Sequence, residues 1–347
     1  MVTVTTVWAD ERLYYPVHAV PYTTARHFPK GKNDPGFHTK LAIGAELAVQ
    51  ARDAGFTFRA VAADCAYGDQ DGFRGELAEA GLPFVMALKP RRGTWAYGAD
   101  AHTPVDAARA LAWDGPDDPG DWAALERTFR DGHTETWQAA DATLGWWGPD
   151  GARRLVVAAA DPATLPEKAT WYLVTNLPRP GGPREAGSGC PPADLAEIVR
   201  IYGIRHWIEQ SYKQVKDQLG WADFQVRSDT AIRRHQALVN CAFCFCWDAW
   251  FHDHPAPRET AASRPEPGRG ERGAARRRTA TGSVLAAGAA RGTRLAFPLD
   301  RAATLVAGMV QGAPAASRWC RNHQGHLPRS CSPVLAAPHK AIRPPRR

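Results

Sequence analysis

Five polar side chains recur at helical spacing in the segment IYGIRHWIEQSYKQVKDQLG. Tyr202, Arg205, Glu209, Lys213 and Lys216 are separated by 3, 4, 4 and 3 positions. At about 100° per residue they lie within an arc of about 80° on one helix face. A single carboxylate among cationic and hydroxyl groups suits a metal ligand flanked by phosphate-binding side chains. The same spacing also fits a solvated helix face on which Glu209 pairs with Lys213.

A second candidate carboxylate, Asp64, directly follows a short apolar strand predicted over residues 58–63. A helix over residues 71–80 and a buried strand over residues 83–88 come next, which together predict a βαβ unit with parallel strands. Open α/β sheets carry their sites at the carboxyl ends of strands. We therefore expect Asp64 at that edge, close enough to Glu209 for the two carboxyl groups to share a divalent ion.

Two antiparallel strands, over residues 2–8 and 13–22, are expected to open the chain, and Pro16 places the second at a sheet edge. Asp10 lies in the turn between them, which faces away from the strand end that carries Asp64. We therefore do not count Asp10 as a catalytic candidate. A helix over residues 40–54 then ends at Gly55.

Residues 90–190 lose the βαβ rhythm and carry alternating, Trp-rich segments, which predict an inserted β-rich subdomain. Four aspartates between residues 114 and 121 fit a solvated turn better than a calcium loop, because the liganding period and terminal Glu are missing. Residues 181–192 are predicted to be a linker. Helices are expected over residues 194–219 and from Asp229 to about Trp250.

The positive charge of the chain is concentrated after residue 250. The formal net charge is +7, but residues 251–347 hold 17 Lys and Arg against 5 Asp and Glu, so residues 1–250 carry a net charge of −5. The tail is also rich in Ala, Arg, Pro and Gly, which predicts disorder. The interpretation we favour is an out-of-frame translation of GC-rich DNA with no selected structure. A basic DNA-binding arm and a weak helix over residues 285–310 are the alternatives.

Seven irregularly spaced cysteines indicate reduced thiols rather than disulfides. Cys241, Cys244 and Cys246 fit core positions on an apolar helix better than a zinc site. The sequence contains no run of about 18 apolar residues, which predicts no membrane span. The expected location is therefore cytoplasmic.

The signature Y-x2-R-x3-E-x6-K, formed by Tyr202, Arg205, Glu209 and Lys216, resembles that of DDE transposases from bacterial insertion sequences, especially the insertion-sequence-four group. The segment ADCAYGD, which starts at Ala63, resembles the block with the second catalytic Asp of that family, and WYLVTN, which starts at Trp171, resembles its last insertion strand. The resemblance covers nearly all of residues 2–250.

The resemblance implies an α/β fold, a ribonuclease-H-like catalytic core with a β-rich insertion. Four regions follow from it: residues 1–90 as the first part of the core, 91–192 as the insertion and linker, 193–250 as the core helices, and 251–347 as the basic tail.

The resemblance also implies roles for single residues. Asp64 and Glu209 would be catalytic ligands of Mg²⁺, with Mn²⁺ as the alternative, for in-line attack on DNA phosphates. Tyr202, Arg205, Lys213 and Lys216 would contact the DNA, and Trp171 would stack on an extruded base. The implied partners are the terminal inverted repeats of the element, the target DNA and a second copy in a synaptic homodimer, with a nucleoid-associated location.

One departure from the family pattern shapes the functional expectation. The first catalytic Asp of the family ends a strand that precedes the two opening strands of this chain, so the core is expected to be incomplete at its N-terminus and the chain to be inactive as given. The opening strand would then expose an unpaired edge. The alternative function is a non-catalytic remnant that binds DNA or a full-length homologue.

Overall fold

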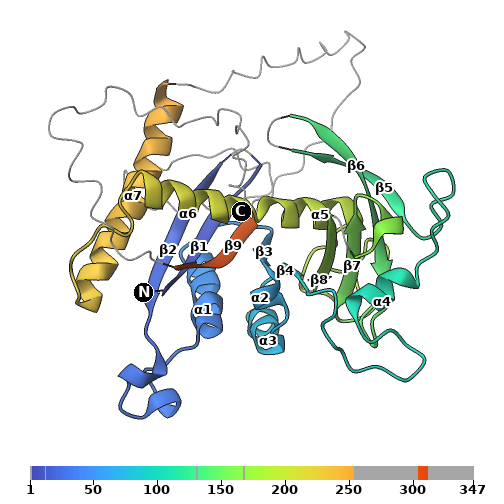
Figure 1. The fold of residues 1–347 in the computed structure, drawn as a ribbon, viewed down its shortest axis with the longest axis horizontal. Coiled ribbons are helices and arrows are strands. Elements are labelled where there is room, and N and C mark those ends of the chain that lie inside the picture. The colour runs from blue at the N-terminus through green and yellow to red at the C-terminus, as the bar shows by residue number, and fades with distance from the viewer. Residues whose placement is uncertain (1, 12, 130–131, 167–168, 254–303, 312–347) are drawn as a thin grey trace, which may run out of the picture.

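The computed structural model describes residues 2–11, 13–129, 132–166, 169–253 and 304–311. Within these residues a single mixed sheet runs through the molecule, in the order β2-β1-β9-β3-β4-β8-β7-β6-β5. Helices lie on both of its faces (Figure 1). This is a three-layer α/β arrangement, and the predicted α/β class is confirmed at that level.

The first two strands form the predicted hairpin. β1 (Val2–Ala9) pairs antiparallel with β2 (Tyr14–Tyr22), and β2 is the edge strand, as Pro16 indicated. Two short 3-10 turns follow, η1 (Ala25–His27) and η2 (Gly31–Asn33). The helix α1 (Lys40–Asp53) begins where the Thr39 hydroxyl accepts a hydrogen bond from the Ala42 N–H at 3.1 Å.

The βαβ unit is present and its strands are parallel. It consists of β3 (Ala60–Ala63), the short helix α2 (Cys65–Gly68), α3 (Asp71–Glu79) and β4 (Phe84–Ala87). Alternate side chains of these strands enter different cores. Val61 and Ala63 pack with α1 and α3, whereas Ala60 and Ala62 pack with the helices of the opposite layer.

The strand β9 (Thr304–Gln311) lies between β1 and β3, antiparallel to the first and parallel to the second. The expectations of a disordered tail and of a weak helix over residues 285–310 are therefore wrong for this segment, although residues 254–303 and 312–347 lie outside the described part. The segment TLVAGMVQ is a short apolar run, a pattern that cannot separate strand from helix. The expected free edge of β1 is also wrong, because β9 occupies it.

The predicted insertion adds one helix and four strands, and its strands extend the same sheet. β8 pairs antiparallel with β4, and β7, β6 and β5 follow it outward. The elements are α4 (Pro104–Arg109), β5 (Ala123–Thr128), β6 (Thr134–Ala142), β7 (Arg154–Ala159), the 3-10 turn η3 (Pro162–Thr164) and β8 (Thr170–Thr175).

Helices from the second half of the described residues cover the other face of the sheet (Figure 1). They are α5 (Leu195–Ile204), α6 (Trp207–Asp217) and α7 (Asp229–Asp253). The apolar arc of residues 194–219 faces the core as predicted: Ile201, Ile204, Ile208 and Val215 are buried and Leu219 packs against them. Helix α7 confirms the last predicted helix.

The expected single helix over residues 194–219 is interrupted. Arg205 and His206 form a tightened turn in which the Arg205 N–H donates to the Tyr202 carbonyl and the Ile208 N–H donates to the Arg205 carbonyl, both three residues back. Gly203, just before the turn, weakens helical propensity there. Tyr202 therefore lies on α5 and Glu209 on α6.

Candidate active site

Asp64 lies at the carboxyl end of β3, where the strand passes into α2. One oxygen of its carboxylate accepts the Ala66 N–H at 3.0 Å and so caps α2. The side chain is half-buried, whereas the four residues of β3 are fully enclosed. Asp64 is thus both a helix cap and a carboxylate at the edge where α/β sheets carry their sites.

The turn that carries Asp64 is held against β4 by a close backbone approach. A Cβ atom on Gly68 would lie 1.9 Å from the carbonyl oxygen of Ala87. Only glycine allows α2 to approach β4 so closely. The position of Asp64 therefore depends on Gly68.

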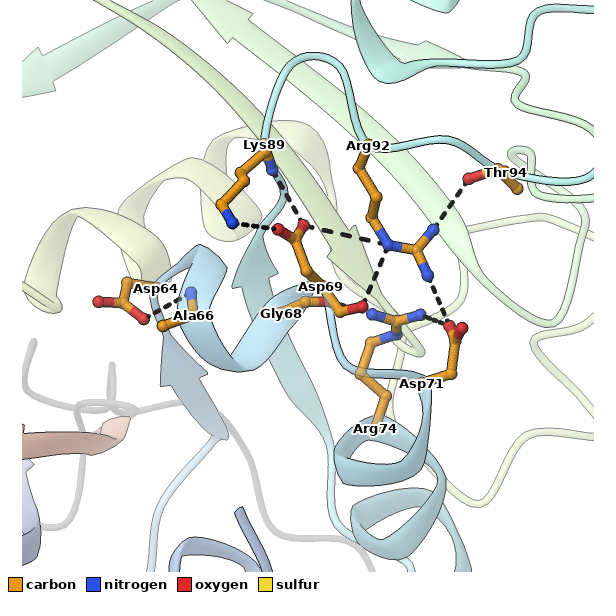
Figure 2. Close-up of polar contacts among 9 residues, drawn as sticks. All are labelled: Asp64, Ala66, Gly68, Asp69, Asp71, Arg74, Lys89, Arg92 and Thr94. Carbon is orange, nitrogen blue, oxygen red and sulfur yellow. Dashed lines mark hydrogen bonds and ion pairs between the residues drawn. The ribbon is translucent and has the colours of Figure 1, made fainter. Parts of the chain in front are cut away.

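A polar network fixes the end of the same turn (Figure 2). One carboxylate oxygen of Asp69 accepts the backbone N–H of Lys89 at 3.1 Å, and the other lies 3.5 Å from the Lys89 ammonium. The Arg92 Nε donates to the Asp69 carbonyl at 3.2 Å. These contacts join the turn to the loop that follows β4.

Two guanidinium groups complete this network. Arg74, almost fully enclosed, donates to the carbonyl of Gly68 and to Asp71, and Arg92 donates to Asp71 at 2.8 Å. Both guanidinium groups lie over the ring of Trp147, at 5.1 and 5.3 Å from its centroid. The network therefore also connects the core to the insertion.

Glu209 and Asp64 both lie within electrostatic reach of Arg205. The Arg205 Nη2 donates to Glu209 Oε1 at 2.9 Å, an i,i+4 pair. Burial alone would lower the pKa of Arg205, but Tyr202, Glu209 and Asp64 outweigh it and raise that pKa. The i,i+4 pair between Glu209 and Lys213 suggested by the spacing is replaced by the pair with Arg205.

The other signature residues are distributed between core and surface. Tyr202 is 8% exposed, and burial raises its pKa. Lys213 is exposed and Lys216 is half-buried, both on α6 after Glu209. The polar row therefore does not form one solvent-facing stripe, because the turn at residues 205–206 and the burial of Tyr202 separate its two ends.

Trp171, on the insertion strand β8, lies against Tyr202 of α5. Its ring meets Tyr202 edge-on with centroids 4.9 Å apart, and it tilts against Trp137 at 4.8 Å. The Arg127 guanidinium lies 4.3 Å from its centroid. Trp171 is half-buried and contacts the signature helix directly, so the structure brings it to the side of α5 that carries Tyr202.

Within the described residues, no group of three or more His, Cys, Asp or Glu side chains forms a metal-binding cluster. This covers the Asp114–Asp121 turn and Cys241, Cys244 and Cys246. The expectation that these cysteines are core residues is wrong for Cys241, which is exposed, whereas Cys244 and Cys246 are half-buried. No helix in this part of the chain is both long and apolar enough to cross a bilayer.

Comparison with known proteins shows what parts of this chain are similar to. Residues 2–144 match the DDE superfamily endonucleases. Over 191 residues the chain is 28% identical to a probable transposase for insertion sequence element IS701 of Microchaete diplosiphon. This chain is therefore similar to insertion-sequence DDE transposases. The aligned region covers 55% of this chain and 42% of that transposase, so the transposase it matches is much longer than the shared part.

The structure also contains features near the site for which the sequence predicted no role. No role was predicted for Asp69, although a second acidic residue so close to Asp64 indicates a polar site. The basic run Lys89-Pro90-Arg91-Arg92 directly after a buried strand is another such signal. The hydrogen bond between the Tyr212 and Thr5 hydroxyl groups, 2.5 Å long, connects α6 to β1. It could not be predicted from local sequence, because the two residues are 207 positions apart.

Proposed function

We propose that this chain carries the catalytic face of a DDE transposase, with DNA cleavage and strand transfer at the ends of an insertion sequence as its reaction. The observation that supports the proposal best is the position of Arg205, whose guanidinium binds Glu209 and lies within electrostatic reach of Asp64. One guanidinium thus pairs with Glu209 and also interacts electrostatically with Asp64, which comes from a distant part of the chain.

The donor chemistry of the pair suits a hard divalent cation. Mg²⁺ is commonly bound through one or two carboxylates, with water and substrate phosphates completing its shell. Asp64 and Glu209 would supply those carboxylates, with Mn²⁺ as an alternative ion. Bound there, the ion would lower the pKa of an attacking water or 3′-hydroxyl and stabilise charge on the phosphate.

Arg205 has a defined task in this proposal. Its guanidinium offers several donors in a planar fork that matches phosphate geometry. Without DNA it neutralises Glu209, and with DNA its remaining donors can bind a phosphate beside the reacting one. Because Arg205 is largely enclosed, with 21% of its side chain exposed, it is already held in position.

The remaining contacts extend along the same helices. Lys213 and Lys216 follow Glu209 on α6 and would bind phosphates farther along the strand. Tyr202 would support this row from the core. We propose Trp171 as a stacking surface for an extruded base, since it is half-buried and lies against Tyr202.

At the level of the whole protein we propose terminal inverted repeats and target DNA as ligands, with a homodimer as the synaptic unit and the nucleoid as its location. A second candidate function is DNA binding without cleavage. The ion pair between Arg205 and Glu209 favours it, because a carboxylate held by a guanidinium is less available to a metal ion.

A nicking assay on DNA that carries the ends of the element separates the two functions. Because we assign no residue of this chain to the first catalytic Asp of the family pattern, the proposal predicts slow Mg²⁺-dependent nicking, roughly a thousandfold or more below that of a chain with all three carboxylates. Asp64→Asn and Glu209→Gln abolish what remains. Glu79→Gln, an exposed carboxylate on α3, is the matched control and retains activity. Binding of the same DNA without nicking by any variant establishes the second candidate, and absence of binding overturns both.

A further inference from the structure

Three large aromatic side chains lie exposed on one border of the insertion. Trp95, Tyr97 and Trp146 are 65%, 72% and 73% exposed, in contrast to Trp122 and Trp137, which are buried. The Trp95 ring is 5.0 Å from Tyr97 and 6.1 Å from Trp146, centroid to centroid. We call these three residues the aromatic rim.

Two separate segments build the rim, and their backbones are in close contact. Trp95 and Tyr97 follow the loop after β4, and Trp146 lies in the turn between β6 and β7. A Cβ on Gly145, whose φ is +56°, would lie 2.6 Å from the carbonyl oxygen of Trp95. The turn at Gly145 therefore packs directly against the backbone of the loop at Trp95, which fixes the distance between the Trp146 and Trp95 rings.

The rings are not packed face to face. The planes of Trp95 and Tyr97 differ by 64°, and those of Trp95 and Trp146 by 50°. With more than half of each side chain exposed, ring faces remain accessible to a flat ligand. Nucleobases are such ligands, because every base has a π-face that can stack on an aromatic ring.

Positive charge lies in the same loop as Trp95 and Tyr97, a few residues before them. Arg91 is exposed and forms no ion pair with any residue in the described part of the chain. The Lys89 side chain is 67% exposed and lies next to Asp69, at the end of the turn that Asp64 begins (Figure 2). Asp100 is the nearby acidic residue of the loop, and its backbone N–H donates to the Tyr97 carbonyl.

We propose that the aromatic rim, together with Lys89 and Arg91, binds a single-stranded segment of DNA. The rings stack on unpaired bases and the two cations bind the phosphates between them. A protein partner would also cover apolar rings, but it would not require the exposed cations Lys89 and Arg91 in the same loop. The ligand class rests on the proposed function, although binding at the rim does not require cleavage.

The test is fluorescence anisotropy with a labelled oligonucleotide of about 12 nucleotides, single-stranded and as a duplex, on the full chain. Trp95→Ala combined with Trp146→Ala is expected to weaken single-strand binding roughly tenfold or more, with a smaller effect on the duplex. Phe245→Ala, at a ring 70% exposed on α7, is the control and leaves both affinities unchanged.

A second variant keeps the test independent of ring packing. Arg91→Glu is expected to weaken binding and to lower the dependence of affinity on salt concentration. Asp64→Asn with Glu209→Gln should retain single-strand binding, so failure of the catalytic proposal would not affect this one. Unchanged single-strand affinity in both the tryptophan double variant and Arg91→Glu overturns the inference. A loss of self-association by sedimentation without a loss of DNA binding overturns it as well.

Discussion

Gly68 lies so close to Ala87 that α2 and β4 meet backbone to backbone, with no space for a side chain between them. This contact sets the distance between the turn that begins at Asp64 and the strand next to it. The candidate active site and the stability of the core are therefore linked at one residue.

Gly68→Ala should destabilise the chain because the added methyl group overlaps the Ala87 carbonyl. We expect a loss of about 1–3 kcal/mol in the free energy of unfolding, measured by urea denaturation. Gly72→Ala, on α3 where a Cβ meets nothing within 4 Å, is the control and should be neutral or slightly stabilising. Equal effects of the two substitutions would contradict the packing argument.

The buried ion pair between Arg154 and Asp141 should make a large contribution to stability, so that loss of Asp141 is strongly destabilising. Its side chain is 1% exposed, pairs with both oxygens of Asp141 at 3.0 and 3.1 Å, and donates to the Ala193 carbonyl at 2.7 Å. Asp141→Ala leaves a buried guanidinium without its carboxylate, so we expect a loss of about 3–5 kcal/mol.

The exposed pair of Arg179 and Asp150 provides the comparison for Asp141, since it has the same chemistry in solvent. Asp150→Ala should cost less than about 1 kcal/mol. Thermal or urea unfolding of the two variants measures the difference, and a cost for Asp141→Ala as small as that for Asp150→Ala would show that the Arg154 pair contributes little.

His18 should make stability fall in mild acid. Burial lowers the pKa of His18 below its ordinary value of 6.5. The unfolded chain therefore binds the proton more readily, so stability is retained above about pH 6.5 and decreases as the pH falls through the lower, folded value. His18→Gln should reduce that decrease between pH 7 and pH 5, followed by urea midpoints, whereas the exposed His102→Gln should leave it unchanged.

Two shortened chains test the role of β9. A chain that stops after residue 311 keeps the strand, and one that stops after residue 303 lacks it. The second leaves backbone groups of β1 and β3 without partners, at about 1–3 kcal/mol for each buried group. We expect it to lose more than about 3 kcal/mol and to aggregate at micromolar concentration, as measured by urea unfolding and light scattering. Equal midpoints for the two chains would refute this role.

The sequence predicted those parts of the fold that depend on local pattern. The edge position of Pro16, the parallel β3 and β4, and the buried arc with Ile201 and Ile208 all follow from residue types and spacing. For the candidate site, the position of Asp64 at a strand end was predicted in the same way, and its shared role with Glu209 stays a prediction.

The remaining features depend on contacts between distant segments. An arginine is usually exposed, but Arg154 is buried, because it pairs with Asp141 and donates a hydrogen bond to the Ala193 carbonyl. The helix break at Arg205 comes next to Gly203, where Arg127 and Trp171 of the insertion lie close to the helix. A partner strand for β1 beyond α7 could not be inferred from the composition of its surroundings.

The place of β9 in the sheet has a consequence for the order in which the protein can fold. During synthesis the β1–β2 hairpin and the β3–β4 pair leave the ribosome long before residue 304, and the strand that joins them is translated after α7. Pairings between such distant segments close late and slowly. The edges of β1 and β3 therefore stay exposed for most of translation and must be protected from pairing with other nascent chains. This topology is expected to make the chain dependent on chaperones in the cell.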